Sequence, residues 1–311
     1  MKISRDTKVF ISGCGGMLGK AVYEKFSPHC QVLATDIDVN EPWLEYGDVI
    51  DFQEILGKAS KFEPDIIINL AALTDLEYCE KNPEITWKTN ALGAENMALI
   101  SKRLGATHIY ISTAGIFDGQ KEHYNDFEHP NPMSVYAKSK HYGEVIVEKM
   151  LDNYFIFRAG WMMGGGYVKD KKFINKIFKQ ILDGKKQLFV VEDKLGTPTY
   201  TVNFADSMFE IVQTKFYGLY NMVCEGSCSR YDVAVEFVRL LGLENDVRIE
   251  IVGSDYFKDE YFAPRPHSEK LINLKLSVRG IHYMKDWKIC LKDYVNSLKP
   301  YLAKCGLFQN D

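Results

Sequence analysis

The feature that most constrains the fold is a glycine-rich turn that follows the first short apolar run, residues 9–11, and precedes a helical pattern. Glycines at this point permit a tight turn, close approach of a pyrophosphate to the backbone, and close packing of helix on strand. The helix then directs its free N–H groups and the positive end of its dipole towards the phosphates. The turn therefore predicts a dinucleotide site, formed by Gly13, Gly16, Met17, Leu18 and Gly19.

Short apolar runs alternate with helical patterns over the first half of the chain. The runs are rich in β-branched or aromatic residues and too short for buried helices, as is typical of strands covered on both faces. The longest helical patterns span residues 84–104 and 134–151. The alternation predicts a Rossmann-type, doubly wound parallel sheet. Its core strands are expected around residues 9–11, 32–34, 66–68, 109–111 and 155–157.

The pattern loosens after about residue 160, where a run of three glycines precedes a lysine-rich helix and prolines punctuate shorter elements. We expect a dinucleotide-binding Rossmann domain over residues 1–160 and a smaller α/β substrate-binding domain over residues 161–311. Part of residues 196–222 is expected to return to the Rossmann domain.

Composition excludes several classes of protein. A net charge of −4 offers no general attraction to nucleic acid or to an anionic membrane. The sequence contains no signal-peptide pattern and no apolar span long enough to cross a bilayer. The seven cysteines are scattered and lack the spacing of a zinc site, so we expect reduced thiols, no metal and a cytoplasmic location.

An aspartate, Asp36, ends the second predicted strand. A carboxylate there accepts hydrogen bonds from the adenosine ribose hydroxyls and repels a 2′-phosphate. We therefore expect NAD(H) to be preferred, with NADP(H) possible; a solvated turn aspartate is the alternative. Further cofactor contacts are expected from Asp48 and Val49 at the adenine edge and from Leu70, Ala71 and Ala72 after the third strand.

Tyr136 and Lys140 lie one helical turn apart, so their side chains share a face. To act as an acid–base near neutrality, a tyrosine with a reference pKa of about 10 needs a shift of about three units. The lysine ammonium and a cationic nicotinamide ring favour the phenolate, and the ammonium can also bond the nicotinamide ribose. Thr113 ends the fourth strand, where it can hold a carbonyl oxygen, and Asn90 can hold a water that relays protons to Lys140.

With these residues assembled, the chain resembles the extended short-chain dehydrogenase/reductase family, and within it the group of dTDP-4-dehydrorhamnose reductases and their relatives. The resemblance covers nearly the whole chain. It implies reduction of a keto group on a nucleotide-linked deoxysugar by NAD(P)H, with Thr113, Tyr136 and Lys140 as the catalytic residues. The segments that carry it are residues 65–74, 117–119, 131–144, 158–161, 190–193, 196–200 and 265–266.

The resemblance also implies a substrate site, in which this chain departs from the group's usual pattern. Ala114 and Gly115 stand where the group usually has Asp-Tyr, and Ser268 and Glu269 where it usually has Asn-Ser. Lys194 replaces a usual glutamine. These departures leave the identity of the sugar open. The expected substrate contacts are Thr74, Ala114, Gly115, Trp161, Thr199, Tyr200 and Arg265.

Two other functions remain open at this point. A sugar-nucleotide epimerase would use the same residues with tightly bound NAD. A non-catalytic regulatory subunit, like that of methionine adenosyltransferase, would keep only the nucleotide site. A dehydratase is disfavoured, because Ala114-Gly115 offers no carboxylate for elimination. The lysine-rich residues 169–186 suit a diphosphate or a solvated face equally well, and a homodimer is possible.

Overall fold

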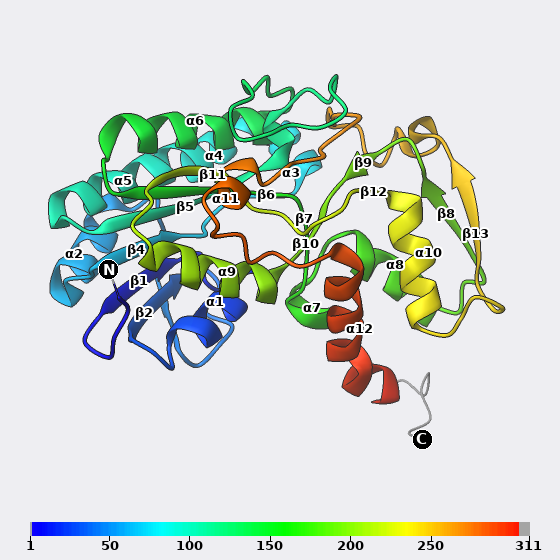
Figure 1. The fold of residues 1–311 in the computed structure, drawn as a ribbon, viewed down its shortest axis with the longest axis horizontal. Coiled ribbons are helices and arrows are strands. Elements are labelled where there is room, and N and C mark those ends of the chain that lie inside the picture. Colours follow the sequence, from blue (N-terminus) through cyan, green and yellow to red (C-terminus); the bar gives the residue numbers. More distant parts are fainter. Residues whose placement is uncertain (1, 305–311) are drawn as a thin grey trace.

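The computed structural model describes residues 2–304 and contains a seven-stranded sheet in which every neighbouring pair is parallel (Figure 1). The strand order is β11-β6-β5-β4-β1-β2-β3, so the direction of winding reverses between β1 and β4. Ligands of such sheets bind outside the carboxyl ends of the strands at this reversal. The strands are β1 Lys8–Ser12, β2 Gln31–Asp36, β3 Leu44–Tyr46, β4 Ile66–Asn69, β5 Thr107–Thr113, β6 Tyr154–Ala159 and β11 Gly218–Asn221.

Helices cover both faces of this sheet, which explains why its strands read as continuous apolar runs. Ile11 and Ile68 belong to one buried cluster, whereas their neighbours Phe10 and Ile67 belong to another. Because successive side chains of a strand point to opposite faces, both faces are sealed. The first cluster includes α1 (Gly19–Phe26) and α9 (Thr201–Gln213), and the opposite face carries α2 (Phe52–Phe62), α5 (Gly93–Leu104) and α6 (Val135–Met150).

The two long predicted helices are present. The first consists of α4 (Pro83–Trp87), a π-helical turn Lys88–Leu92 and α5, in direct succession. The second is α6, whose start is fixed because Ser134 Oγ accepts a hydrogen bond from the Ala137 N–H at 3.1 Å. The predicted Rossmann-type α/β fold is thus confirmed.

The second half of the chain adds β11 and α9 to the sheet and builds a smaller α/β region beyond its carboxyl edge (Figure 1). This region holds three two-stranded pairings, β7 with β10, β9 with β12 and β8 with β13. The domain boundary at residue 160 stays a prediction. The remaining strands and α-helices of the chain are β7 Trp161–Met163, β8 Gln187–Val191, β9 Leu195–Gly196, β10 Pro198–Tyr200, β12 Cys228–Ser229, β13 Arg248–Val252, α3 Leu76–Lys81, α7 Gly166–Lys169, α8 Phe173–Leu182, α10 Arg230–Leu240, α11 Leu274–Val278 and α12 Trp287–Lys304.

Residues 2–304 bear on three expectations from the sequence, which are no membrane-spanning helix, no metal site and reduced cysteines. Over this range the helices include none that is long and apolar enough to span a bilayer. Histidine, cysteine and acidic side chains of the same residues form no cluster suited to a metal ion. The described cysteines are all buried and free, while Cys305 lies outside the described residues.

Candidate active site

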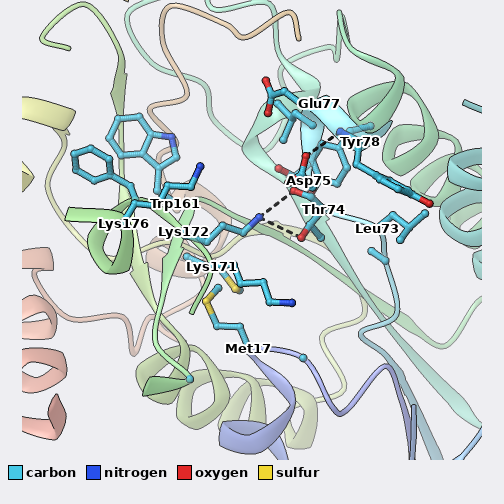
Figure 2. A pocket seen from close by; sticks show the side chains of 18 of the residues that line it. Met17, Leu73, Thr74, Asp75, Glu77, Tyr78, Trp161, Lys171, Lys172 and Lys176 are labelled. Carbon is cyan, nitrogen blue, oxygen red and sulfur yellow. Dashed lines mark hydrogen bonds between the residues drawn. The ribbon is translucent and has the colours of Figure 1, made fainter. Parts of the chain in front are cut away.

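A cavity of about 2300 Å³ opens at the carboxyl edge of the sheet and extends into the smaller α/β region. Its walls combine the glycine turn after β1, the ends of β4 and β5, the start of α6, and α8. Figure 2 shows the part of this cavity where Met17 lies across from Lys172 and Thr74. The cavity therefore joins both halves of the chain at the edge where ligands of such sheets bind.

The glycine turn has the shape of a phosphate cradle. Gly13 has φ +70°, and a Cβ there would overlap the backbone of Ala71. A Cβ on Gly19 would overlap the Cys14 carbonyl, so this glycine allows α1 to pack on the turn although it does not line the cavity itself. The predicted contacts Gly13, Gly16, Met17 and Leu18 do line it. This backbone fits a pyrophosphate at the start of α1.

Asp36 is fixed beside this turn. One carboxylate oxygen accepts the Gly15 N–H at 2.8 Å and the other accepts the Asp38 N–H at 2.9 Å. Lone pairs of both oxygens remain for a ligand, because a carboxylate accepts about four hydrogen bonds. The other predicted adenosine and backbone contacts, Asp48, Val49, Leu70, Ala71 and Ala72, line the same cavity.

The Asn90 side chain makes three hydrogen bonds within the protein. Its Oδ1 accepts the Leu73 N–H at 2.7 Å, and its Nδ2 donates to the Leu73 carbonyl at 3.0 Å and to Ser139 Oγ at 3.1 Å. The side chain is buried and does not line the cavity. Asn90 thus ties the loop after β4 to α6 from the π-helical turn, and its contact with a water at Lys140 stays a prediction.

The predicted catalytic residues Thr113, Tyr136 and Lys140 all line the cavity. Burial raises the pKa of Tyr136 to about 12, and its hydrogen bond with Thr113 opposes that rise. The protein without its cofactor therefore does not produce the fall in the pKa of Tyr136 that the sequence led us to expect. At neutral pH the phenol is protonated, which is the state that donates a proton.

Lys140 is held in an apolar setting. It is 4% exposed, and its Nζ lies 4.1 Å from the centroid of the Tyr110 ring. Burial lowers the pKa of Lys140 to about 7, while the Glu144 carboxylate opposes that fall. Glu144 accepts two hydrogen bonds from Arg158, at 2.9 and 2.8 Å. Burial favours protonation of Glu144, yet the bonds from Arg158 lower its pKa overall.

The predicted substrate residues divide into two sets. Thr74, Gly115, Trp161 and Arg265 line the cavity, and their contact with a substrate stays a prediction. Ala114, Thr199 and Tyr200 do not line it and are corrected here.

The three corrected residues are buried elsewhere. Ala114 is 1% exposed and packs with Ile116 and Phe117 in a separate apolar cluster. Thr199 is buried within β10, and the Tyr200 ring lies 5.7 Å from the ring of Tyr294 on α12. None of residues 196–200 lines the cavity, so this segment forms no part of its wall.

Two cationic side chains that line the cavity already bind other residues of the same chain. Arg265 donates to both carboxylate oxygens of Glu77 on α3, in an ion pair with a shortest distance of 2.6 Å. Lys172 donates to the carbonyl of Thr74 at 2.9 Å and to its hydroxyl at 3.1 Å (Figure 2). These contacts tie the smaller region to the loop after β4.

Sequence reasoning assigned no role to two charged residues of the cavity wall, Arg230 and Glu269. The Arg230 guanidinium lies 3.6 Å from the centroid of the Trp161 ring, and Glu269 Oε2 accepts the Trp161 Nε1–H at 2.7 Å. Glu269 occupies a position at which this chain differs from the group's usual Asn-Ser, and this difference could have drawn attention to it. Arg230 begins α10, where nothing in the sequence marks it as facing the cavity.

A Rossmann sheet with a glycine cradle after β1, and a tyrosine–lysine pair on the helix after β5 beside Thr113, defines an extended short-chain dehydrogenase/reductase. More narrowly, the chain belongs to the family described as the RmlD substrate binding domain, whose model matches residues 7–299.

Relatives of known name are similar along their full length. The spore coat polysaccharide biosynthesis protein SpsK of Bacillus subtilis is 28% identical over 93% of this chain and 97% of its own. The dTDP-4-dehydrorhamnose reductase of Clostridium acetobutylicum has a TM-score of 0.85 at 31% identity, covering 94% of this chain and 100% of that one. The dTDP-4-dehydrorhamnose reductase of Bacillus anthracis, solved in complex with NADP, has a TM-score of 0.85 at 27% identity, covering 96% and 100%.

Proposed function

We propose that this protein reduces the keto group of a nucleotide-linked deoxysugar with NADH or NADPH. The observation that carries the proposal is that one cavity joins the glycine cradle after β1 to Thr113, Tyr136 and Lys140. Similarity to dTDP-4-dehydrorhamnose reductases along the whole chain supports the same reaction.

The residues of the cavity have distinct roles in this reaction. The cofactor supplies the hydride that reaches the carbonyl carbon. Thr113 and Tyr136 donate hydrogen bonds to the carbonyl oxygen, and Tyr136 gives that oxygen its proton as the alkoxide forms. Lys140, buried beneath them, favours the resulting phenolate when it is protonated, because opposite charges in a low-dielectric site attract strongly.

The smaller region supplies the contacts to the nucleotide part of the substrate. Lysines of α8 and its flanks line the cavity, including Lys171, Lys176 and Lys179. Lys169 is already paired with Glu41 at 2.8 Å, so its charge is compensated within the protein. The remaining ammonium groups suit the diphosphate of a nucleotide sugar.

NADH is proposed as the better cofactor. The Asp36 carboxylate is fixed at the end of β2 by two backbone N–H groups and faces the cavity. A 2′-phosphate beside it would meet like charge, whereas ribose hydroxyls would meet an acceptor.

A homodimer is also proposed. Apolar side chains are exposed along α4, α5 and α6, among them Trp87 and Tyr142, each 39% exposed. Their rings meet edge to face with centroids 5.9 Å apart. Such a surface is suited to pairing with the same helices of a second copy.

Steady-state kinetics with NADH and a panel of nucleotide-linked 4-keto-6-deoxy sugars tests the reaction. Oxidation of NADH in step with formation of the sugar alcohol is expected. Interconversion of sugars without net consumption of NADH would indicate an epimerase instead. Retention of a dinucleotide without turnover of any keto sugar would indicate a binding subunit.

A further inference from the structure

Gly115 lies beside the catalytic hydroxyl and adds no side chain to the cavity wall there. A Cβ on this residue would lie 3.4 Å from Glu269 Oε1 and 3.5 Å from Thr113 Oγ1. Two oxygen atoms from distant parts of the chain therefore flank one point on the cavity wall. Tyr136, Thr113, Gly115 and Glu269 all line that cavity.

The Glu269 carboxylate is held at this place from two directions. Its backbone N–H donates to the Leu195 carbonyl at 2.8 Å, which joins the segment to β9. Its Oε2 accepts the Trp161 Nε1–H at 2.7 Å. The hydrogen bonds among the described residues include none to Oε1, so this oxygen keeps its lone pairs for a ligand.

A cationic side chain, Arg230, lies beside the same tryptophan. Its guanidinium lies 3.6 Å from the centroid of the Trp161 ring and 4.9 Å from that of Phe173. The described residues include no carboxylate within ion-pair distance of it. Burial lowers the pKa of Arg230 to about 10, and the charge of Glu269 is the first of the neighbouring charges that oppose that fall. Because the charge of Arg230 already acts on Glu269, this carboxylate does not require a cation as its ligand. A neutral hydroxyl group is a sufficient partner.

We propose that Glu269 selects the sugar by accepting a hydrogen bond from the hydroxyl on the carbon next to the reacting carbonyl. This inference rests on the proposed function. In a 4-keto-6-deoxy sugar the carbons beside the carbonyl are C3, which carries a hydroxyl, and C5, which carries the methyl group. With the carbonyl oxygen at Thr113 and Tyr136, our proposal places the neighbouring C3 hydroxyl against Gly115, within reach of Glu269 Oε1. Glu269 is thus a specificity residue for keto sugars that keep the C3 hydroxyl.

The test compares two probes, dTDP-4-keto-6-deoxyglucose and its 3-deoxy analogue. For each enzyme variant the ratio of the two kcat/KM values is measured, because general damage to the fold affects both values and cancels. The wild type is expected to favour the hydroxylated probe by tenfold or more, the discrimination typical of a hydrogen bond to a charged acceptor. In Glu269→Ala the ratio is expected to fall to within about threefold of unity.

Three further variants sharpen the result. Glu269→Gln keeps a neutral partner, so an intermediate ratio is expected. Trp161→Phe keeps a ring beneath Arg230 but removes the N–H that orients Glu269, so the ratio is expected to fall with the carboxylate still present. Glu260→Ala is the matched control, since Glu260 lines the same cavity outside the sugar contacts named above and should leave the ratio unchanged.

The outcomes separate the two proposals. If the wild type reduces neither probe nor any other keto sugar, the proposed function fails and this inference fails with it. If the wild type reduces both probes and Glu269→Ala keeps the wild-type ratio, the role of Glu269 is refuted while the reductase activity stands.

Discussion

Replacing the buried Lys140 by methionine is expected to stabilise the protein without its cofactor and to abolish turnover. The lysine is 4% exposed, with its Nζ over the Tyr110 ring, and burial lowers its pKa from 10.5 to about 7. Methionine has a similar length, carries no charge and makes favourable contacts with aromatic rings. The substitution therefore removes the cost of burying an ammonium group while keeping the packing.

The size of this effect depends on pH. The unfolded chain binds a proton at Lys140 up to about pH 10.5, whereas the folded protein releases it near pH 7. Below pH 7 Lys140 is protonated in both the folded and the unfolded state, and the cost of burying its charge is largest. Between pH 7 and pH 10.5 the unfolded state binds more protons than the folded state, so the free energy of unfolding rises with pH. At 1.36 kcal/mol per pKa unit, the cost is about 4 kcal/mol at pH 7 and about 2 kcal/mol at pH 9.

Urea unfolding of the cofactor-free protein at pH 7 and pH 9, followed by tryptophan fluorescence, measures this difference. The advantage of Lys140→Met over the wild type should shrink by about 2 kcal/mol between the two pH values. Lys138→Met, at an exposed position of the same helix, is the matched control and should show no such change. The argument that burial of Lys140 destabilises the folded protein is refuted if Lys140→Met is no more stable than the wild type. It is also refuted if the gain in free energy of unfolding is the same at both pH values.

Three other substitutions test separate parts of the site. Tyr136→Phe should lower kcat by at least a hundredfold while cofactor affinity stays near the wild-type value; rapid turnover would contradict its role as proton donor. Asp36→Ala should raise NADPH affinity by about tenfold and narrow the preference for NADH in fluorescence titrations; equal wild-type affinities would contradict the preference itself. Arg158→Met should cost about 3–5 kcal/mol in urea unfolding, because Glu144 is left buried without its partner; the double variant with Glu144→Leu should recover most of that loss.

Local sequence patterns were sufficient for the parts of this protein that are built from neighbouring residues. The glycine turn between β1 and α1 depends on backbone conformation and close contact, which only glycine permits at Gly13. Tyr136 and Lys140 share a face because both stand on one helix. The buried strands are recognisable since a sheet covered on both faces requires unbroken apolar runs.

The tertiary structure decided what depends on residues far apart in the chain. The sequence could not show that Ala114 and Tyr200 turn into the core, nor that Asn90 bonds the loop after β4. Ala114 and Gly115 themselves offer no carboxylate, whereas the fold brings Glu269 beside Gly115 from more than a hundred residues away. A strand or helix pattern determines which residues share a face. Which other residues that face contacts is decided only when the chain packs, and in this cavity those contacts determine the chemistry.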